Sequence, residues 1–429
     1  MLRRLAANAA ANVVNGASQL AFQLAATGLV TRHTSSSQFA LWSLVMSIAS
    51  IAPLFACNLS NAVARRLSVG ERAANELERV RHQESVMAAG RRMAALLLGV
   101  GLAFGLAAGG ASPWVYTALL GTAPWDGAIQ IAAFFIGSCW IVGSQPEIGW
   151  LLYKQRNWAI ALAAVTARLL AVCALWLLLA GNHATAGVVA AAATLWIGKW
   201  SVSRMGPSKP PEQGDNTSEW LQLKRVTRGL AVWGFASMAI QGATIPLIAL
   251  MSGAETSAYF LAYSLVIAIT GLATATVNTL VSPIASILAN AQLERARYVV
   301  TRATIVLTGA VLVALIAVWA SMRPILQVWT GQSSQSGAVS TAFALFGVQQ
   351  LIRTIGLPMA IALAMGIRPE LLQRVPLLEG TVGVVIAIPM GFWLGPAWFL
   401  IGLSVAAAAG VAGIFWLAHR HLLVEQVAP

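Results

Sequence analysis

Residues 157–180 read NWAIALAAVTARLLAVCALWLLLA, an apolar run with one charged side chain, Arg168, near its middle. An α-helix crosses the ~30 Å hydrocarbon core of a bilayer with about 20 residues. No water reaches that region, so the backbone must satisfy its own hydrogen bonds, which a helix does. This run therefore predicts a transmembrane helix, and similar runs occur on both sides of it.

The whole chain has the composition of a membrane protein. Of its 429 residues, 58% are hydrophobic and only 10% are charged, whereas soluble domains carry about 25% charged residues. We therefore expect an all-α integral membrane protein with about twelve transmembrane helices. These helices are expected near residues 8–30, 38–64, 88–110, 127–152, 157–180, 184–203, 229–251, 257–287, 299–321, 338–365, 374–394 and 397–418.

Lys and Arg residues lie overwhelmingly on one side of the expected helices. All but four of the 27 fall in the N-terminal segment or at every second break between helices. The exceptions are Arg32 and Arg323 at the opposite breaks, and Arg168 and Arg353 inside helices. Positive charge marks cytoplasmic loops, so we expect a bacterial inner-membrane protein with both termini in the cytoplasm. The net charge of +13 then reflects topology rather than a nucleic-acid partner.

A polar segment divides the chain into two similar halves. Residues 204–228 contain GPSKPP and QGDN, which are typical of a flexible cytoplasmic linker between bundles at 1–203 and 229–429. Pro146 and Pro358 occupy matching places in the two halves. Since each half holds an even number of helices, we expect two parallel six-helix bundles related by a pseudo-twofold axis along the membrane normal. A further match repeats Phe39, Ser43, Leu44, Val45 and Ile48 as Phe260, Ser264, Leu265, Val266 and Ile269.

Four charged side chains lie deeper inside the expected helices than any others. Arg168 and Arg353 are deep, and a mid-membrane Arg costs about 2.5–3.5 kcal/mol even on the lenient insertion scale. Glu379 lies in the eleventh expected helix, and Glu147 follows Pro146 in the fourth. One interpretation pairs these charges as structural ion bridges. The other lets the arginines bind an anionic substrate, and makes Glu147 or Glu379 the carrier of a coupling cation or proton.

Amide side chains form a stripe on the first expected helix. Five of them follow one another at steps of three or four residues, which places them on one helical face. They could hold helices together, but a wall of hydrogen-bonding groups for a hydroxyl-rich ligand explains five of them better. The stripe consists of Asn8, Asn12, Asn15, Gln19 and Gln23. The candidate substrate-binding residues are Arg168, Arg353, Asn15, Gln19, Gln23, Asn61 and Asn278.

The sequence gives no support for an enzyme. It contains no phosphate-binding glycine loop, and the three Cys and five His residues have no metal-ligand spacing. The outward-facing loops are short and carry few titratable groups, whereas catalytic residues usually sit on a sizeable loop or domain. We expect no catalytic residue, no metal and no cofactor.

The arrangement resembles the polysaccharide (O-antigen) repeat-unit flippases, which belong to the multidrug/oligosaccharidyl-lipid/polysaccharide exporter superfamily. The same superfamily holds multidrug exporters and lipid II flippases. The resembling segments are residues 39–70, with CNLSNAVARR at 57–66, and residues 259–290, with VSPIAS at 281–286. The topology and the internal repeat support the resemblance more strongly than these motifs do.

The resemblance implies an alternating-access transporter. Its substrate would be an undecaprenyl-diphosphate-linked oligosaccharide, with Arg168 and Arg353 on the diphosphate or acidic sugars and the amide stripe on hydroxyls. Na⁺ or H⁺ would drive transport, and the partners would be membrane lipids and other polysaccharide-assembly proteins.

Two alternatives to the flippase remain. A multidrug cation antiporter of the same superfamily is the nearer one, but at least half of the deep charge here is cationic. A scaffold or a polysaccharide polymerase is the more distant one. The buried arginines weigh against an inert scaffold, and the short outer loops weigh against a polymerase.

Overall fold

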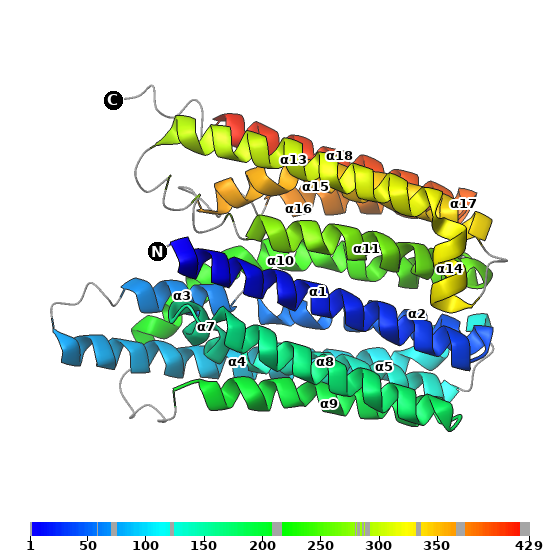
Figure 1. Cartoon of the computed structure of the whole chain (residues 1–429), viewed down its shortest axis with the longest axis horizontal. Coiled ribbons are helices and arrows are strands. Elements are labelled where there is room, and N and C mark those ends of the chain that lie inside the picture. The colour runs from blue at the N-terminus through cyan, green and yellow to red at the C-terminus, as the bar shows by residue number, and fades with distance from the viewer. Residues whose placement is uncertain are drawn as a thin grey trace. The chain divides into compact units, whose positions relative to one another are not determined.

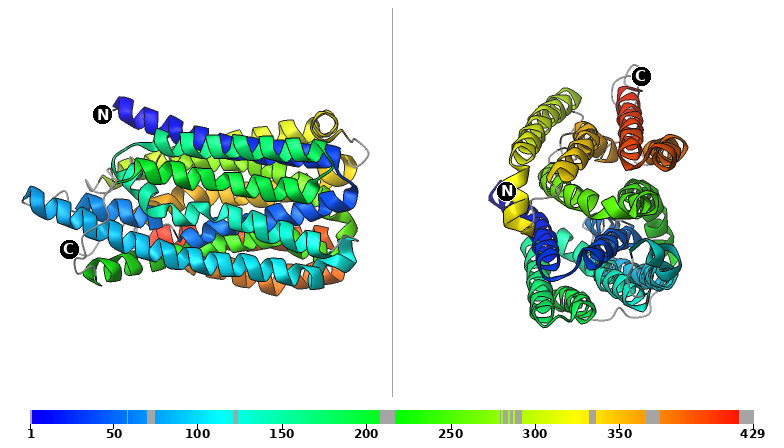
Figure 2. Two further views of the ribbon diagram at one scale, coloured as in Figure 1. Left: turned by 90° about the horizontal axis from the view of Figure 1, so that it is seen from below. Right: turned by 90° about the vertical axis from the view of Figure 1, so that its right-hand side faces the viewer.

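The computed structural model describes residues 2–57, 59–69, 75–120, 124–207, 217–278, 292–331, 336–365 and 374–420, with the single residues 280, 284 and 287. Regular structure in these residues is helical throughout, and nine helical stretches among them are long and apolar enough to cross a membrane. The chain divides into two compact units, Met1–Pro246 and Leu247–Pro429. Within each unit the long helices run side by side (Figures 1 and 2).

The first unit contains α1 to α9 and most of α10. Its helices are α1 (Leu2–His33), α2 (Ser36–Ala49), η1 (Ala52–Ala56), α3 (Leu59–Val69), α4 (Glu76–Leu120), α5 (Pro124–Ser138), α6 (Trp140–Gly143), α7 (Gln145–Tyr153), α8 (Asn157–Ala180), α9 (Ala184–Met205) and α10 (Thr217–Met251). The longest is α4, which extends well beyond the expected span 88–110. α1, α9 and α10 are also long enough to span, but they are not among the nine stretches, and α1 owes this to its amide side chains.

Two expected helices of this unit, 38–64 and 127–152, are present as the apolar stretches Ser36–Ser68 and Trp125–Tyr153, and each of them contains internal breaks. The first is divided into α2, η1 and α3, with Pro53 at the start of η1 and Cys57 in the left-handed region at φ 49°. The second is divided into α5, α6 and α7, with Pro146 in the first turn of α7. Proline lacks an amide hydrogen and fits best in the first turn of a helix, where that hydrogen would have no partner in the helix, so η1 and α7 begin at these positions.

Close helix crossings in this unit depend on glycine. A Cβ atom on Gly137 of α5 would lie 2.7 Å from the carbonyl oxygen of Ala192 on α9. A Cβ atom on Gly149 of α7 would lie 2.7 Å from the carbonyl oxygen of Ser60 on α3. Small residues allow membrane helices to approach this closely.

The second unit contains η3 (Gly253–Glu255), α11 (Thr256–Asn278), α13 (Leu293–Ala320), α14 (Met322–Thr330), α15 (Ser336–Met365), α16 (Arg374–Val382), the π-helical turn η5 (Gly383–Ala387), α17 (Ile388–Leu394) and α18 (Pro396–Ala418). The eleventh expected helix, 374–394, is present as α16, η5 and α17. A π-helical turn inside an α-helix often accompanies a functional site, and this one begins four residues after Glu379.

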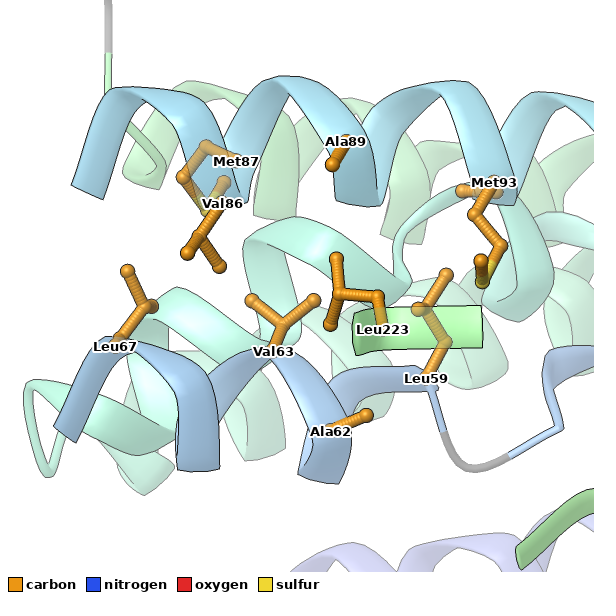
Figure 3. Packing of buried hydrophobic residues seen from close by; sticks show 10 residues of the cluster. Leu59, Ala62, Val63, Leu67, Val86, Met87, Ala89, Met93 and Leu223 are labelled. Carbon is orange, nitrogen blue, oxygen red and sulfur yellow. The ribbon is translucent and has the colours of Figure 1, made fainter. Parts of the chain in front are cut away.

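An apolar cluster joins α3, α4 and the start of α10 (Figure 3). Leu223 of α10 is fully buried between side chains of α3 and α4. Its neighbours in the cluster are Leu59, Ala62, Val63, Leu67, Val86, Met87, Ala89, Met93 and Ala94. The first turns of α10 are thereby packed onto the first unit.

Candidate functional site

Arg168 of α8 is held by the polar face of α1. Its Nη1 atom donates hydrogen bonds to the carbonyl oxygen of Asn15 at 2.8 Å, to Asn15 Oδ1 at 2.9 Å and to Ser18 Oγ. Further along the same pair of helices, Asn157 Nδ2 donates to Asn12 Oδ1 at 3.3 Å. The amide stripe of α1 and the Arg of α8 therefore form one polar seam within the first unit, which we call the α1–α8 seam.

The Arg168 guanidinium is anchored at one corner only. Its three anchoring acceptors are all on Nη1, and in the described part of the chain neither Nε nor Nη2 makes a hydrogen bond. No carboxylate among the described residues forms a salt bridge with it. The Nε–Nη2 edge is the one that binds two oxygens of a phosphate or carboxylate at once. The seam thus carries a positive charge stabilised by neutral dipoles.

The remaining candidates lie in different places. Gln19 is exposed and Gln23 is partly buried, one and two turns further along α1. Asn61 is exposed on α3 and makes no hydrogen bond to Arg168. Asn278 is the last residue of α11, and its side chain lies outside the described residues. Of the amides whose side chains the structure describes, only Asn15 makes a hydrogen bond with Arg168.

Arg353 differs from Arg168 because it is paired with an acid. Its Nε donates to Glu379 Oε1 at 2.9 Å, and its Nη2 donates to the same oxygen. The pair joins α15 to α16, and both side chains are largely buried. Gly410 of α18 packs closely against this pair, because a Cβ atom there would lie 3.1 Å from Glu379 Oε2. The third nitrogen, Nη1, is buried and has no hydrogen-bond partner among the described residues.

Glu147 is also paired with an Arg. Arg91 Nε of α4 lies 3.0 Å from Glu147 Oε1 of α7, and Arg91 Nη2 donates to the carbonyl oxygen of Pro207 at 3.3 Å. Both candidate acids therefore have a guanidinium partner. The ion-pair interpretation of the deep charges holds for Arg353 with Glu379, whereas Arg168 is held by neutral groups.

Sequence reasoning missed Ser18 in the α1–α8 seam, and it also missed a separate group in which Arg66 and His82 meet Glu219. Ser18 lies three residues after Asn15 on the same face of α1, and this spacing was the available signal. Glu219, in the first turn of α10, accepts two hydrogen bonds from Arg66, at 3.0 Å from Nε and 2.7 Å from Nη2. His82 of α4 adds to this group, with Nδ1 at 3.4 Å from Glu219 Oε1. Glu219 lies within residues 204–228, which were expected to form a flexible linker, so no ion pair was expected for it.

Comparison with known proteins identifies the type of fold. No family model and no curated protein matches the sequence. Solved structures do match. An inward-facing multidrug resistance MATE family transporter of the MOP superfamily is 13% identical, with a TM-score of 0.74 over 97% of this chain and 96% of that one. The chain has the fold of the MOP superfamily transporters.

Two further structures extend this likeness. A MOP superfamily transporter from Pyrococcus furiosus, whose reversed binding-pocket polarity suggests a different function, is 15% identical with a TM-score of 0.69 over 97% of this chain and 95% of that one. The lipid II flippase MurJ, in an inward closed conformation, is 10% identical with a TM-score of 0.69 over 92% of this chain and 85% of that one. The expected resemblance and the all-α, two-bundle membrane fold with pseudo-twofold symmetry are therefore confirmed at the level of fold.

Proposed function

We propose that this protein transports an anionic, lipid-linked oligosaccharide from the cytoplasmic to the periplasmic leaflet of a bacterial inner membrane by alternating access. The observation that carries the proposal is the state of Arg168. It lies about halfway along a membrane-spanning helix and has no acidic partner among the described residues. The Nε–Nη2 edge of its guanidinium makes no hydrogen bond to any described residue.

The α1–α8 seam fits the headgroup of such a substrate chemically. Three acceptors on Nη1 fix the orientation of the guanidinium before any ligand arrives, which lowers the entropy lost on binding. The other edge then offers two parallel donors to a diphosphate or to an acidic sugar. Gln19 and Gln23 continue along the same helix and supply amides for sugar hydroxyls.

Similarity to solved structures is compatible with this substrate class. One matching protein is a lipid II flippase, and another is a transporter with reversed pocket polarity. The alternative is a multidrug transporter, as in the first matching protein. A pocket for organic cations needs unpaired acids, and here Glu147 and Glu379 are each paired with an Arg. The charge pattern favours the anionic substrate.

The other expected features remain proposals alongside it. Arg353, Asn61 and Asn278 are further candidates for substrate contact. If Glu147 or Glu379 binds a coupling Na⁺ or H⁺, that ion must compete with the guanidinium already present. Both termini are assigned to the cytoplasm on the distribution of Lys and Arg, and residues 204–228 are assigned as the linker between the bundles.

Deletion of the gene, followed by analysis of prenyl-linked oligosaccharides, tests the proposal. Trapping of these intermediates on the cytoplasmic face, with loss of surface polysaccharide, is expected. Complementation of the deletion strain then tests the site. Arg168→Gln should abolish transport, whereas Arg168→Lys should retain part of it, because the charge remains but the planar pair of donors is lost. Arg297→Gln, on the exposed start of α13, is the control and should transport normally.

Full transport by Arg168→Gln would contradict the role of the seam. Normal surface polysaccharide in the deletion strain, with no trapped intermediate, would contradict the substrate. Uptake of organic cations would then become the assay to pursue.

A further inference from the structure

The shared end of the α8–α9 hairpin is unusually basic. Between residues 148 and 207 the sequence contains no Asp or Glu, although it contains five Lys and Arg residues, Lys154, Arg156, Arg168, Lys199 and Arg204. α8 and α9 pack side by side and are joined by a short turn, so the start of α8 and the end of α9 lie together (Figure 1). Four of the five cations belong to this end, and only Arg168 is deep.

Aromatic side chains hold the cations of α9. Lys199 Nζ lies 4.9 Å from the ring centre of Trp196, and the guanidinium carbon of Arg204 lies 4.0 Å from that of Trp200. Trp196 is itself fixed, because its Nε1 donates to the carbonyl oxygen of Ile136 at 3.1 Å. A cation over an indole face is stabilised by the ring without being neutralised.

A third cation at the same end has the same environment. Lys154 Nζ, at the end of α7, lies 4.8 Å from the ring centres of both Trp150 and Tyr153. Among the described residues, no acid forms a salt bridge with Lys154, Lys199 or Arg204. At the start of α13, by contrast, Arg297 is paired with Glu294. The end of the α8–α9 hairpin therefore has positive charge that no described side chain balances.

We propose that this end, defined by Lys154, Lys199 and Arg204 with their aromatic partners, binds the headgroup of an anionic phospholipid of the surrounding leaflet. Membrane-interface aromatic residues place their rings at headgroup level, so the cations they hold stand where lipid phosphates are. Trp200 is 56% exposed and Trp158, in the first turn of α8, is 41% exposed. These rings offer the apolar surface that the upper acyl chains need.

Phospholipid binding to the purified, detergent-solubilised full chain tests the proposal. Titration with phosphatidylglycerol, followed by native mass spectrometry, should show a bound lipid that phosphatidylcholine does not replace. Two neutralised charges should weaken binding by about 30-fold in the double variant K199Q/R204Q, because each Lys or Arg near an anionic surface contributes a factor of about five. R204Q alone changes an exposed side chain and should weaken it by about fivefold.

The matched control is R302Q, because Arg302 of α13 also lies over an aromatic ring, that of Tyr298 at 5.2 Å. It should bind phosphatidylglycerol as the unmodified protein does. Equal weakening by R302Q would show diffuse attraction and overturn the site. Unchanged binding by R204Q, or equal binding of phosphatidylcholine by the unmodified protein, would also overturn it. None of these outcomes depends on the transported substrate.

Discussion

Substitutions in the Arg353–Glu379 pair should show strong energetic coupling. The side chains are only 15% and 11% exposed, so either single change leaves one charge buried without its counter-charge. Breaking a buried pair in this way costs about 3–5 kcal/mol. We expect Arg353→Gln and Glu379→Gln to lower the free energy of unfolding by about 3 kcal/mol each. The double variant leaves two neutral amides and should cost about as much as either single one.

Unfolding of the detergent-solubilised protein by dodecyl sulfate, followed by helical circular dichroism, measures these values. The resulting interaction energy of about 3 kcal/mol is at the upper end for contacting residues. A parallel cycle on Arg297 and Glu294 is the control, since these side chains are 47% and 90% exposed and exposed pairs contribute little. If the two single changes at the buried site simply added, the pair would not be the buried ion bridge described here.

Three further predictions concern packing and local stability. Gly137→Ala should destabilise the protein by roughly 1–3 kcal/mol, because the new methyl group would clash with Ala192. Gly99→Ala is the control and should leave the stability unchanged, because no atom lies within 4 Å of the added methyl group. Unfolding in dodecyl sulfate compares the two variants. Leu223→Ala should cost about 2–5 kcal/mol in the same assay, because the side chain is fully buried. Glu219→Gln removes the negative charge and one of the two oxygens that accept hydrogen bonds from Arg66 of α3. Amide hydrogen exchange in the first turns of α10 should therefore speed up, and unchanged exchange would contradict that anchor.

Much of the fold follows from the sequence because the bilayer limits what a chain can do. Apolar runs near 20 residues long leave helices as the simplest solution, and the fold class followed from them. The internal breaks were harder to place. Pro53 and Pro146 were visible, but proline is tolerated inside membrane helices when neighbours satisfy the freed groups. Whether a proline bends a helix or restarts it depends on the neighbouring helices, and sequence alone does not fix those.

The site was predicted in its residue types but not in its pairing. Arg168 and the α1 amides stood out because each is expensive in hydrocarbon. Their direct contact depends on which face of α8 meets α1, and that is a tertiary choice. For the same reason the sequence left open which acid each Arg would meet. The structure pairs Glu147 with Arg91 and Glu379 with Arg353.

The α1–α8 seam has a consequence for biosynthesis. α1 leaves the ribosome before α8, yet its amides make it too polar to be counted among the nine strongly apolar stretches of the described residues. Asn12 and Asn15 receive their partners only when Asn157 and Arg168 have been made, about 150 residues later. The arginine in turn enters the bilayer at lower cost if those acceptors are waiting. Nascent chains that end before α8 should therefore hold α1 weakly in the membrane, and completing α8 should secure both helices together.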